Sequence, residues 1–162
     1  MSSNPNFFVK QAVVIGAGTM GHGIAQVAAS SGMQVQLFDV NEKAAKDGLA
    51  QICANLNKGV SKGKLSQTEK EACLERLTVA PNLAKAVSNA QLVIEAAPEN
   101  IELKRSIFQE IDAHAPTDAI FGSNTSSLSI TEIASVCTHP ERVLGMHFFN
   151  PPYILKFLEL VR

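Results

Sequence analysis

A glycine-rich turn between two runs of small and apolar residues constrains the fold of this chain more than any other feature. Gln11 to Gly16 predicts a buried strand, because it contains Ala-Val-Val-Ile, and Met20 to Ser30 predicts a helix of small side chains. The turn Gly16-Ala17-Gly18-Thr19-Met20-Gly21 is a complete GxGxxG pattern. Its first glycine permits a tight turn, its second lets a pyrophosphate approach the backbone, and its third lets helix and strand pack closely. The pattern predicts a dinucleotide site at the helix start, where free amide groups bind phosphates.

An acidic residue stands where the adenosine of such a dinucleotide would lie. Asp39 ends the second predicted strand, 18 positions after Gly21. A carboxylate there accepts hydrogen bonds from both ribose hydroxyls and repels a 2′-phosphate. No arginine occurs in Val40-Asn41-Glu42, which follows. The sequence therefore predicts NAD, rather than NADP, as the cofactor.

Strands and helices are predicted to alternate along the rest of the chain. Predicted strands cover residues 34–39, 77–80, 92–96, 119–122, 143–149 and 154–161, and predicted helices cover 42–58, 66–76, 101–113 and 130–136. The alternation predicts an α/β fold of the Rossmann type, with a doubly wound, mostly parallel sheet. Two features depart from the plain pattern: a helical pair inserted after the second strand, and a C-terminal antiparallel hairpin around Pro151-Pro152.

Composition excludes several classes of partner. The formal net charge is −1 with a pI of about 6.4, so we expect no nucleic-acid or membrane partner. The three cysteines, Cys53, Cys73 and Cys137, form no CxxC pair, which argues against a disulfide framework or a metal site and for a reducing compartment. Residues 1–10 lack the pattern of a signal peptide, and no apolar stretch is long enough to span a bilayer. We expect a cytoplasmic protein.

A histidine and a glutamate are predicted to face each other across the C-terminal hairpin. The midpoint of His147 and Glu159 is residue 153, inside the loop, so a symmetric hairpin puts the two side chains opposite each other on one face. Glu159 lies among apolar residues, where burial without a partner would be costly, and an imidazole is a suitable partner. The pair predicts a general base that takes an alcohol proton while a hydride leaves for NAD. The alternative is a core histidine beside a solvent-facing glutamate.

A polar run follows the predicted strand at 119–122. Ser123-Asn124-Thr125-Ser126-Ser127 would lie at the carboxyl edge of the sheet, where ligands bind in such folds, and could hydrogen-bond the reacting oxygen. The alternative interpretation is a Ser/Thr cap for the helix that begins at Ile130.

Several segments together resemble the NAD-binding domain of the L-3-hydroxyacyl-CoA dehydrogenases. The resemblance runs from about Gln11 to Val161, and it rests on the glycine-rich turn, Asp39 and three further segments: Glu95-Ala96-Ala97-Pro98-Glu99-Asn100, Ser123-Asn124-Thr125-Ser126-Ser127-Leu128 and His147-Phe148-Phe149-Asn150-Pro151. The second and third of these segments are far more specific than GxGxxG alone.

The resemblance implies NAD-dependent oxidation of L-3-hydroxyacyl-CoA to 3-ketoacyl-CoA in fatty-acid metabolism. 3-Hydroxybutyryl-CoA is one candidate substrate. It implies that His147 is the catalytic base, Glu159 its partner, and that Ser126 binds the reacting oxygen. With the motif, it implies NAD contacts from Gly16, Gly18, Thr19, Met20, Gly21, Asp39, Glu99, Lys104, Ser126 and Asn150. The acyl-CoA substrate would meet Ser126, Asn150 and, in the inserted helical pair, Lys62; a solvated lysine in a helix break is the alternative for Lys62.

Two features depart from the family pattern. The family continues into a helical C-terminal domain that closes the cleft, forms the dimer and supplies a catalytic asparagine. We expect residues 1–162 to be the NAD-binding domain alone, without that domain, so that an isolated NAD-binding module of poor activity is one alternative function. Pro152-Tyr153 is similar to a sister group of sugar-acid dehydrogenases of the L-gulonate type, the other alternative, whereas Phe148-Phe149 and Lys156 are similar to the acyl-CoA branch.

Overall fold

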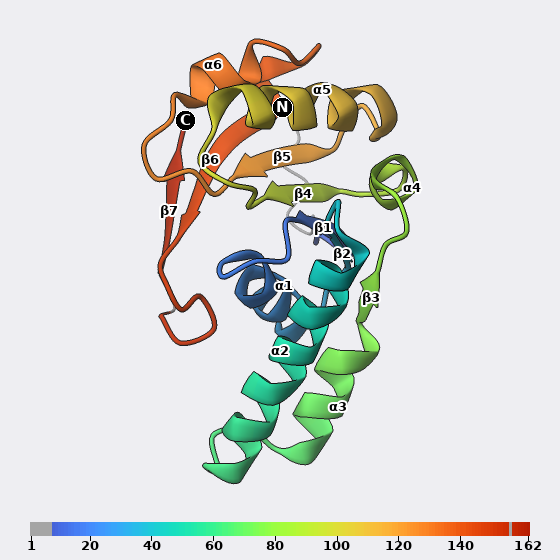
Figure 1. The fold of residues 1–162 in the computed structure, drawn as a ribbon, viewed down its shortest axis with the longest axis vertical. Helices are drawn as coiled ribbons and strands as arrows, with labels where there is room; N and C mark the ends of the chain where they lie inside the picture. Colours follow the sequence, from blue (N-terminus) through green and yellow to red (C-terminus); the bar gives the residue numbers. More distant parts are fainter. Residues whose placement is uncertain (1–7, 156) are drawn as a thin grey trace.

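The fold is built on one twisted sheet, seen in a computed structural model that describes residues 8–155 and 157–162. Lys156 lies outside the described residues. The strand order is β3-β2-β1-β4-β5-β6-β7, in which β1 to β6 pair in parallel and β7 pairs antiparallel with β6 (Figure 1). The strands are β1 (Gln11–Ile15), β2 (Gln34–Phe38), β3 (Leu77–Val79), β4 (Leu92–Glu95), β5 (Ile120–Ser123), β6 (Val143–Phe148) and β7 (Leu158–Val161). The predicted doubly wound α/β fold with an antiparallel C-terminal hairpin is confirmed.

Helices cover both faces of this sheet. One layer holds α1 (Gly21–Ser30), α2 (Glu42–Ser61) and α3 (Gln67–Glu75), and the other holds α4 (Leu83–Val87), α5 (Ile101–His114) and α6 (Ile130–Ala134) (Figure 1). A short 3-10 helix, Pro140–Arg142, precedes β6. Within the described residues, no helix is long and apolar enough to cross a membrane.

The burial of β1 explains why its sequence is continuously apolar. Ala12 and Val14 pack into the core beneath α1 and α2, whereas Val13 and Ile15 pack into the core beneath α4 and α5. Successive side chains of a strand point to opposite faces, so a strand covered on both faces needs apolar residues at every position.

The inserted helical pair forms an arm that projects from the sheet. Asn41 caps the start of α2, where its side chain accepts hydrogen bonds from the amides of Lys43 and Ala44 at 3.0 and 3.3 Å. Ser66 and Glu69 form the predicted capping box at the start of α3. The arm stands beside α1 and reaches away from the strands (Figure 1). Helix α2 continues to Ser61, beyond the predicted end at residue 58.

Two local predictions were wrong. Helix α4 was missed, because five residues are too few to show a helical period, although Asn82 caps it by accepting from the amide of Lys85 at 2.8 Å. Strand β7 begins at Leu158, four residues later than predicted, and all four of its residues are exposed. The Glu159 side chain is accordingly 55% exposed, since no element of the described chain covers β7.

Candidate active site

The glycine-rich turn has the geometry that a bound pyrophosphate requires. Gly16 adopts φ +91°, which favours glycine, and a Cβ on Gly21 would lie 1.7 Å from the carbonyl oxygen of Gly16. Helix α1 and strand β1 can approach this closely only without that Cβ. A Cβ on Gly18, in contrast, would meet nothing within 4 Å. The space above Gly18 is therefore open to a ligand that approaches the backbone.

The start of helix α1 offers amide groups to an anion. Among the described residues, no side chain caps this helix, and Thr19 and Met20 lie at its start, exposed and half-buried respectively. The Asp39 carboxylate holds the turn against the end of β2: Oδ2 accepts from the Ala17 amide at 2.9 Å and Oδ1 from the Asn41 amide at 3.0 Å. The uncapped helix start, the open space and the acid together fit an NAD molecule.

His147 lies between two polar partners. In the β6–β7 pairing it stands directly opposite Glu159, as the hairpin arithmetic predicts. Its Nδ1 lies 3.1 Å from Glu159 Oε2, and its Nε2 lies 3.2 Å from Ser126 Oγ. The ring also packs against Phe149, with 4.7 Å between the ring centroids. An ionised carboxylate can only accept, so with Glu159 at Nδ1 the nitrogen Nε2 is the one that faces Ser126 Oγ.

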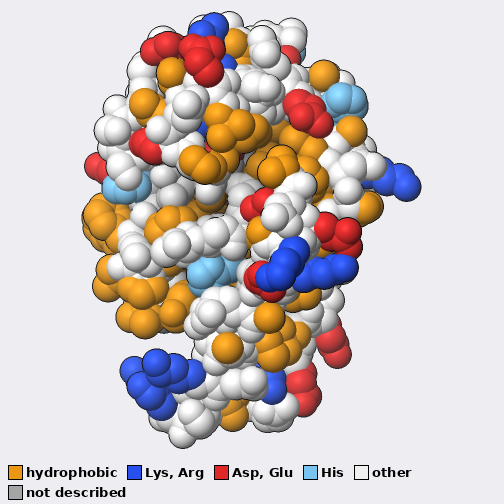
Figure 2. Space-filling model, in the orientation of Figure 1, with side chains coloured by type: hydrophobic (Ala, Val, Ile, Leu, Met, Phe, Trp, Pro, Cys, Tyr) orange, Lys and Arg blue, Asp and Glu red, His pale blue; other side chains and the backbone are white. Residues whose placement is uncertain are grey.

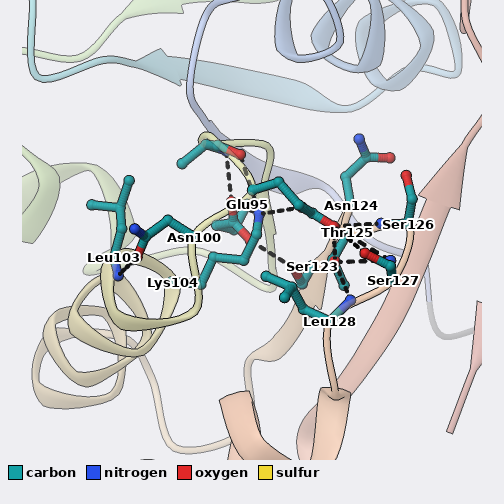
Figure 3. Close-up of polar contacts among 12 residues, drawn as sticks. Glu95, Asn100, Leu103, Lys104, Ser123, Asn124, Thr125, Ser126, Ser127 and Leu128 are labelled. Carbon is teal, nitrogen blue, oxygen red and sulfur yellow. Dashed lines mark hydrogen bonds and ion pairs between the residues drawn. The ribbon is translucent and has the colours of Figure 1, made fainter.

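Glu99 holds the loop that carries Ser126. Its Oε1 accepts from the Ser126 amide at 3.1 Å, the Ser127 amide at 3.3 Å and the hydroxyl of Thr125. Partial burial opposes ionisation of this carboxyl, but these hydrogen bonds and the charge of Lys104 hold its pKa below the ordinary value. Figure 3 shows the contacts converging on Thr125, Ser126 and Ser127 at the end of β5.

Lys104 and Glu95 form a buried ion pair beneath this loop. Lys104 Nζ lies 2.7 Å from Glu95 Oε1, and the two side chains are 1% and 0% exposed. Lys104 Nζ also donates to the carbonyl oxygen of Ala97 at 3.2 Å and lies 3.6 Å from Glu99 Oε2. The family resemblance implies that Lys104 contacts NAD. In the structure, the Lys104 ammonium lies among groups of the protein itself.

Two polar residues of the site lie in segments named from the sequence, but neither was assigned a role of its own. Glu95 ends β4 inside an apolar run, and this position was the available signal. Asn124 follows β5, and its Oδ1 accepts from the amide of Phe148 at 2.8 Å, which ties the loop to β6.

Asn150, a predicted site residue, is exposed after β6, where a cis peptide bond joins it to Pro151. Among the described residues, no group of three His, Cys, Asp or Glu side chains could hold a metal ion.

A cavity of about 800 Å³ lies between α1, the tip of the arm and the segment after β6. Its lining has a basic part and an apolar part. The arm supplies the basic residues Lys58, Lys62 and Lys64, and the hairpin supplies the apolar residues Phe148, Phe157 and Leu158. Figure 2 shows basic side chains near the free end of the arm and hydrophobic ones over the hairpin loop. Lys58, in the last turn of α2, and Lys64, just after this helix, were not predicted, although both lie close in sequence to Lys62.

Comparisons with known proteins identify a family and several relatives that this chain is similar to. The family model described as "3-hydroxyacyl-CoA dehydrogenase, NAD binding domain" matches residues 11–162. The chain is 44% identical to a probable 3-hydroxybutyryl-CoA dehydrogenase of Bacillus subtilis over 95% of this chain and 53% of that protein. It is 40% identical to the mitochondrial hydroxyacyl-coenzyme A dehydrogenase of Rattus norvegicus, over 95% of this chain and 51% of the relative.

A solved structure gives the same result. The crystal structure of 3-hydroxybutyryl-CoA dehydrogenase from Escherichia coli K12 matches with a TM-score of 0.91 and 43% identity, over 95% of this chain and 32% of that one. The chain thus spans between a third and about a half of the length of these relatives.

Proposed function

This chain belongs to the 3-hydroxyacyl-CoA dehydrogenase family, of which it carries the NAD-binding domain, and from that premise we propose that the protein oxidises L-3-hydroxyacyl-CoA to 3-ketoacyl-CoA with NAD. Relatives named for 3-hydroxybutyryl-CoA support a short acyl chain as the substrate. The proposal places this reaction in fatty-acid metabolism. The observation that carries the proposal is the contact of His147 with both Glu159 and Ser126, at 3.1 and 3.2 Å, at the carboxyl edge of the sheet.

The chemistry follows from those two contacts. When bound, NAD accepts the hydride that leaves the carbinol carbon of the substrate. His147 Nε2 accepts the hydroxyl proton as the carbon–oxygen double bond forms, and Glu159 keeps the ring in the required tautomer and stabilises the imidazolium. Ser126 Oγ hydrogen-bonds the reacting oxygen. In the reverse direction the imidazolium returns the proton to the ketone oxygen.

The cofactor residues lie along the carboxyl edge of the sheet. The turn from Gly16 to Gly21 would hold the pyrophosphate, and Asp39 the adenosine ribose. Glu99 and Asn150, both exposed, would meet NAD at the end nearest His147, where Asn150 also borders the substrate.

The cavity suits a coenzyme A thioester. Lys58, Lys62 and Lys64 supply positive charge for the phosphates of coenzyme A, and the apolar lining from the hairpin suits the acyl portion. Phe148, which lines the cavity, belongs to β6, the strand that also carries His147, so the apolar part of the cavity reaches that strand.

A second domain is part of the proposal. The relatives are about two to three times as long as the matched segment, and the described chain exposes Ile154, Phe157 and Leu160, each 62% exposed. Such a group of apolar side chains is typical of an interface. We expect a helical domain to cover it, to close the cleft and to form the dimer, and residues 1–162 alone to bind NAD with poor turnover.

The test follows NADH formation from 3-hydroxybutyryl-CoA, with L-gulonate as the competing substrate and NADP as the competing cofactor. Turnover of the acyl-CoA with NAD, at least about 100-fold above the other combinations, is the expected result. Faster oxidation of L-gulonate would replace the proposal by the sugar-acid alternative.

A further inference from the structure

Glu95 is a buried acid that joins three elements at the edge of the active site. It is the last residue of β4 and is fully buried. Its Oε1 accepts from the Ala97 amide at 2.6 Å and from Lys104 Nζ at 2.7 Å, and its Oε2 accepts from Ser123 Oγ at 2.6 Å. One carboxylate thus connects the loop after β4, helix α5 and the end of β5 (Figure 3).

Lys104 passes this connection on to the loop above. Its ammonium has all its partners within the protein: Glu95, the carbonyl oxygen of Ala97 and the carboxylate of Glu99. Glu99 directs Oε2 toward Lys104 and Oε1 toward the amides of Ser126 and Ser127. Glu95, Lys104 and Glu99 thus form a continuous series of contacts that begins at the end of β4. The series ends at Ser126, the residue that contacts His147.

Stability alone is a weak reason for such a series. Replacing both members of a buried ion pair by uncharged residues of similar volume is often neutral or stabilising, because desolvation of the charges offsets their attraction. Positioning is a stronger reason, since a misplacement of about 1 Å at a reacting group can cost about 100-fold in rate.

We propose that Glu95 and Lys104 are positioning residues, which hold Glu99 and, through it, the loop Thr125–Ser127 so that Ser126 Oγ lies beside His147 Nε2. The role rests on the proposed function, because Ser126 and His147 are its reacting groups. It assigns Lys104 to the support of the active-site loop and gives Glu95 a part in the reaction without contact with substrate.

The test replaces the pair as a unit, by Glu95→Gln with Lys104→Met in the complete protein. We expect kcat with 3-hydroxybutyryl-CoA to fall about 10- to 100-fold, while KM for the acyl-CoA changes less than about threefold. The matched control is a pair nearer the surface on the same helix, Glu102→Gln with Arg105→Met, in which Arg105 Nη1 and Glu102 Oε1 lie 3.4 Å apart. The control variant should retain the kcat of the unaltered protein.

A double-mutant cycle separates positioning from general damage. In a Ser126→Ala background the paired replacement should lower kcat less than about threefold further, because the residue that it positions is already gone. Losses that simply multiply, or an unchanged kcat in the paired variant, would overturn the positioning role.

A second measurement does not depend on turnover. In the protein without substrate, the ring NMR signals of His147 should shift in the paired variant, and should shift no further when it is combined with Ser126→Ala. Unshifted signals in the paired variant would contradict the inference. Absence of NADH formation by the unaltered protein would contradict the proposed function instead, and the NMR result would still decide whether the series positions Ser126.

Discussion

At the scale of single residues, the candidate chemistry depends on one imidazole with two different partners. Glu159 fixes one ring nitrogen of His147 and Ser126 lies at the other. The Glu159 side chain is 55% exposed, so its contact with His147 does not carry the desolvation cost of a buried ion pair. Its value to the site is the orientation of the ring rather than the stability of the fold.

The first prediction concerns this pair. His147→Ala should lower kcat by about 100- to 10,000-fold, the range of a lost general base. Glu159→Gln should lower kcat only about 10- to 100-fold, because it removes one charge-assisted hydrogen bond and leaves the imidazole in place. Steady-state NADH formation measures both, and equal losses in the two variants would contradict the separate roles.

The second prediction concerns a thiol far from the site. Burial, and next the charge of Asp112, raises the pKa of Cys137 to about 11. Since only the thiolate reacts, alkylation of Cys137 at pH 8 should be about 100-fold slower than that of the half-buried Cys53. Mass spectrometry of the native protein after timed alkylation gives the two rates, and comparable rates would show that Cys137 is not held protonated.

At the scale of elements, the turn from β1 to α1 contains glycines that are needed for two different reasons, packing within the protein and space for a ligand. Gly21 is required by packing within the protein, since its Cβ would lie 1.7 Å from a backbone oxygen, whereas Gly18 faces open space. Gly21 is therefore needed for the fold, and Gly18 for ligand binding.

The third prediction uses this contrast. Gly21→Ala should cost more than about 3 kcal/mol of unfolding free energy, because backbone must move to admit the methyl group. Gly18→Ala should leave that free energy unchanged within about 1 kcal/mol but weaken NAD binding at least about tenfold, since the methyl group occupies the space of the cofactor. Denaturant unfolding and calorimetry with NAD measure the two quantities; unaltered NAD affinity in Gly18→Ala would place the cofactor elsewhere.

The fourth prediction concerns the α2–α3 arm. Lys62→Ala should raise KM for 3-hydroxybutyryl-CoA and leave KM for the matching pantetheine thioester unchanged, because only the coenzyme A substrate carries the phosphates that the lysine would meet. Lys85→Ala, on helix α4 away from the cavity, is the control. Equal effects of Lys62→Ala on both substrates would argue against a phosphate contact.

At the scale of the whole molecule, most of the large exposed apolar side chains lie together on the C-terminal hairpin and its loop. Ile154, Phe157, Leu158, Leu160 and Val161 are between 39% and 62% exposed. The opposite end of the sheet, at β3, has no comparable group among its described residues. The surface beside His147 is therefore the one that a second domain would cover.

The fifth prediction follows from this surface. Residues 1–162 alone should bind NAD, oxidise 3-hydroxybutyryl-CoA poorly, and bind a hydrophobic dye at the hairpin. A polypeptide that also contains the expected helical half should gain at least about 100-fold in kcat/KM and lose the dye signal. Full activity of residues 1–162 by themselves would refute the need for that half.

Much of the fold was predictable because local patterns encode it. The GxGxxG turn between β1 and α1, the capping box at Ser66 and the alternation of elements all depend on residues near one another in sequence. The contact between His147 and Glu159 was predictable for the same reason: across a short hairpin, register is a matter of counting residues from the loop.

The tertiary structure alone decided which partners meet across separate elements. Ser126 reaches His147 because β5 and β6 are adjacent and parallel, and Glu95, Lys104 and Glu99 connect only when α5 packs on the ends of β4 and β5. The exposure of β7 likewise depends on what packs against it. Sequence periodicity fixes the face to which a side chain points, since it follows from backbone geometry, but what covers that face depends on the packing of distant segments.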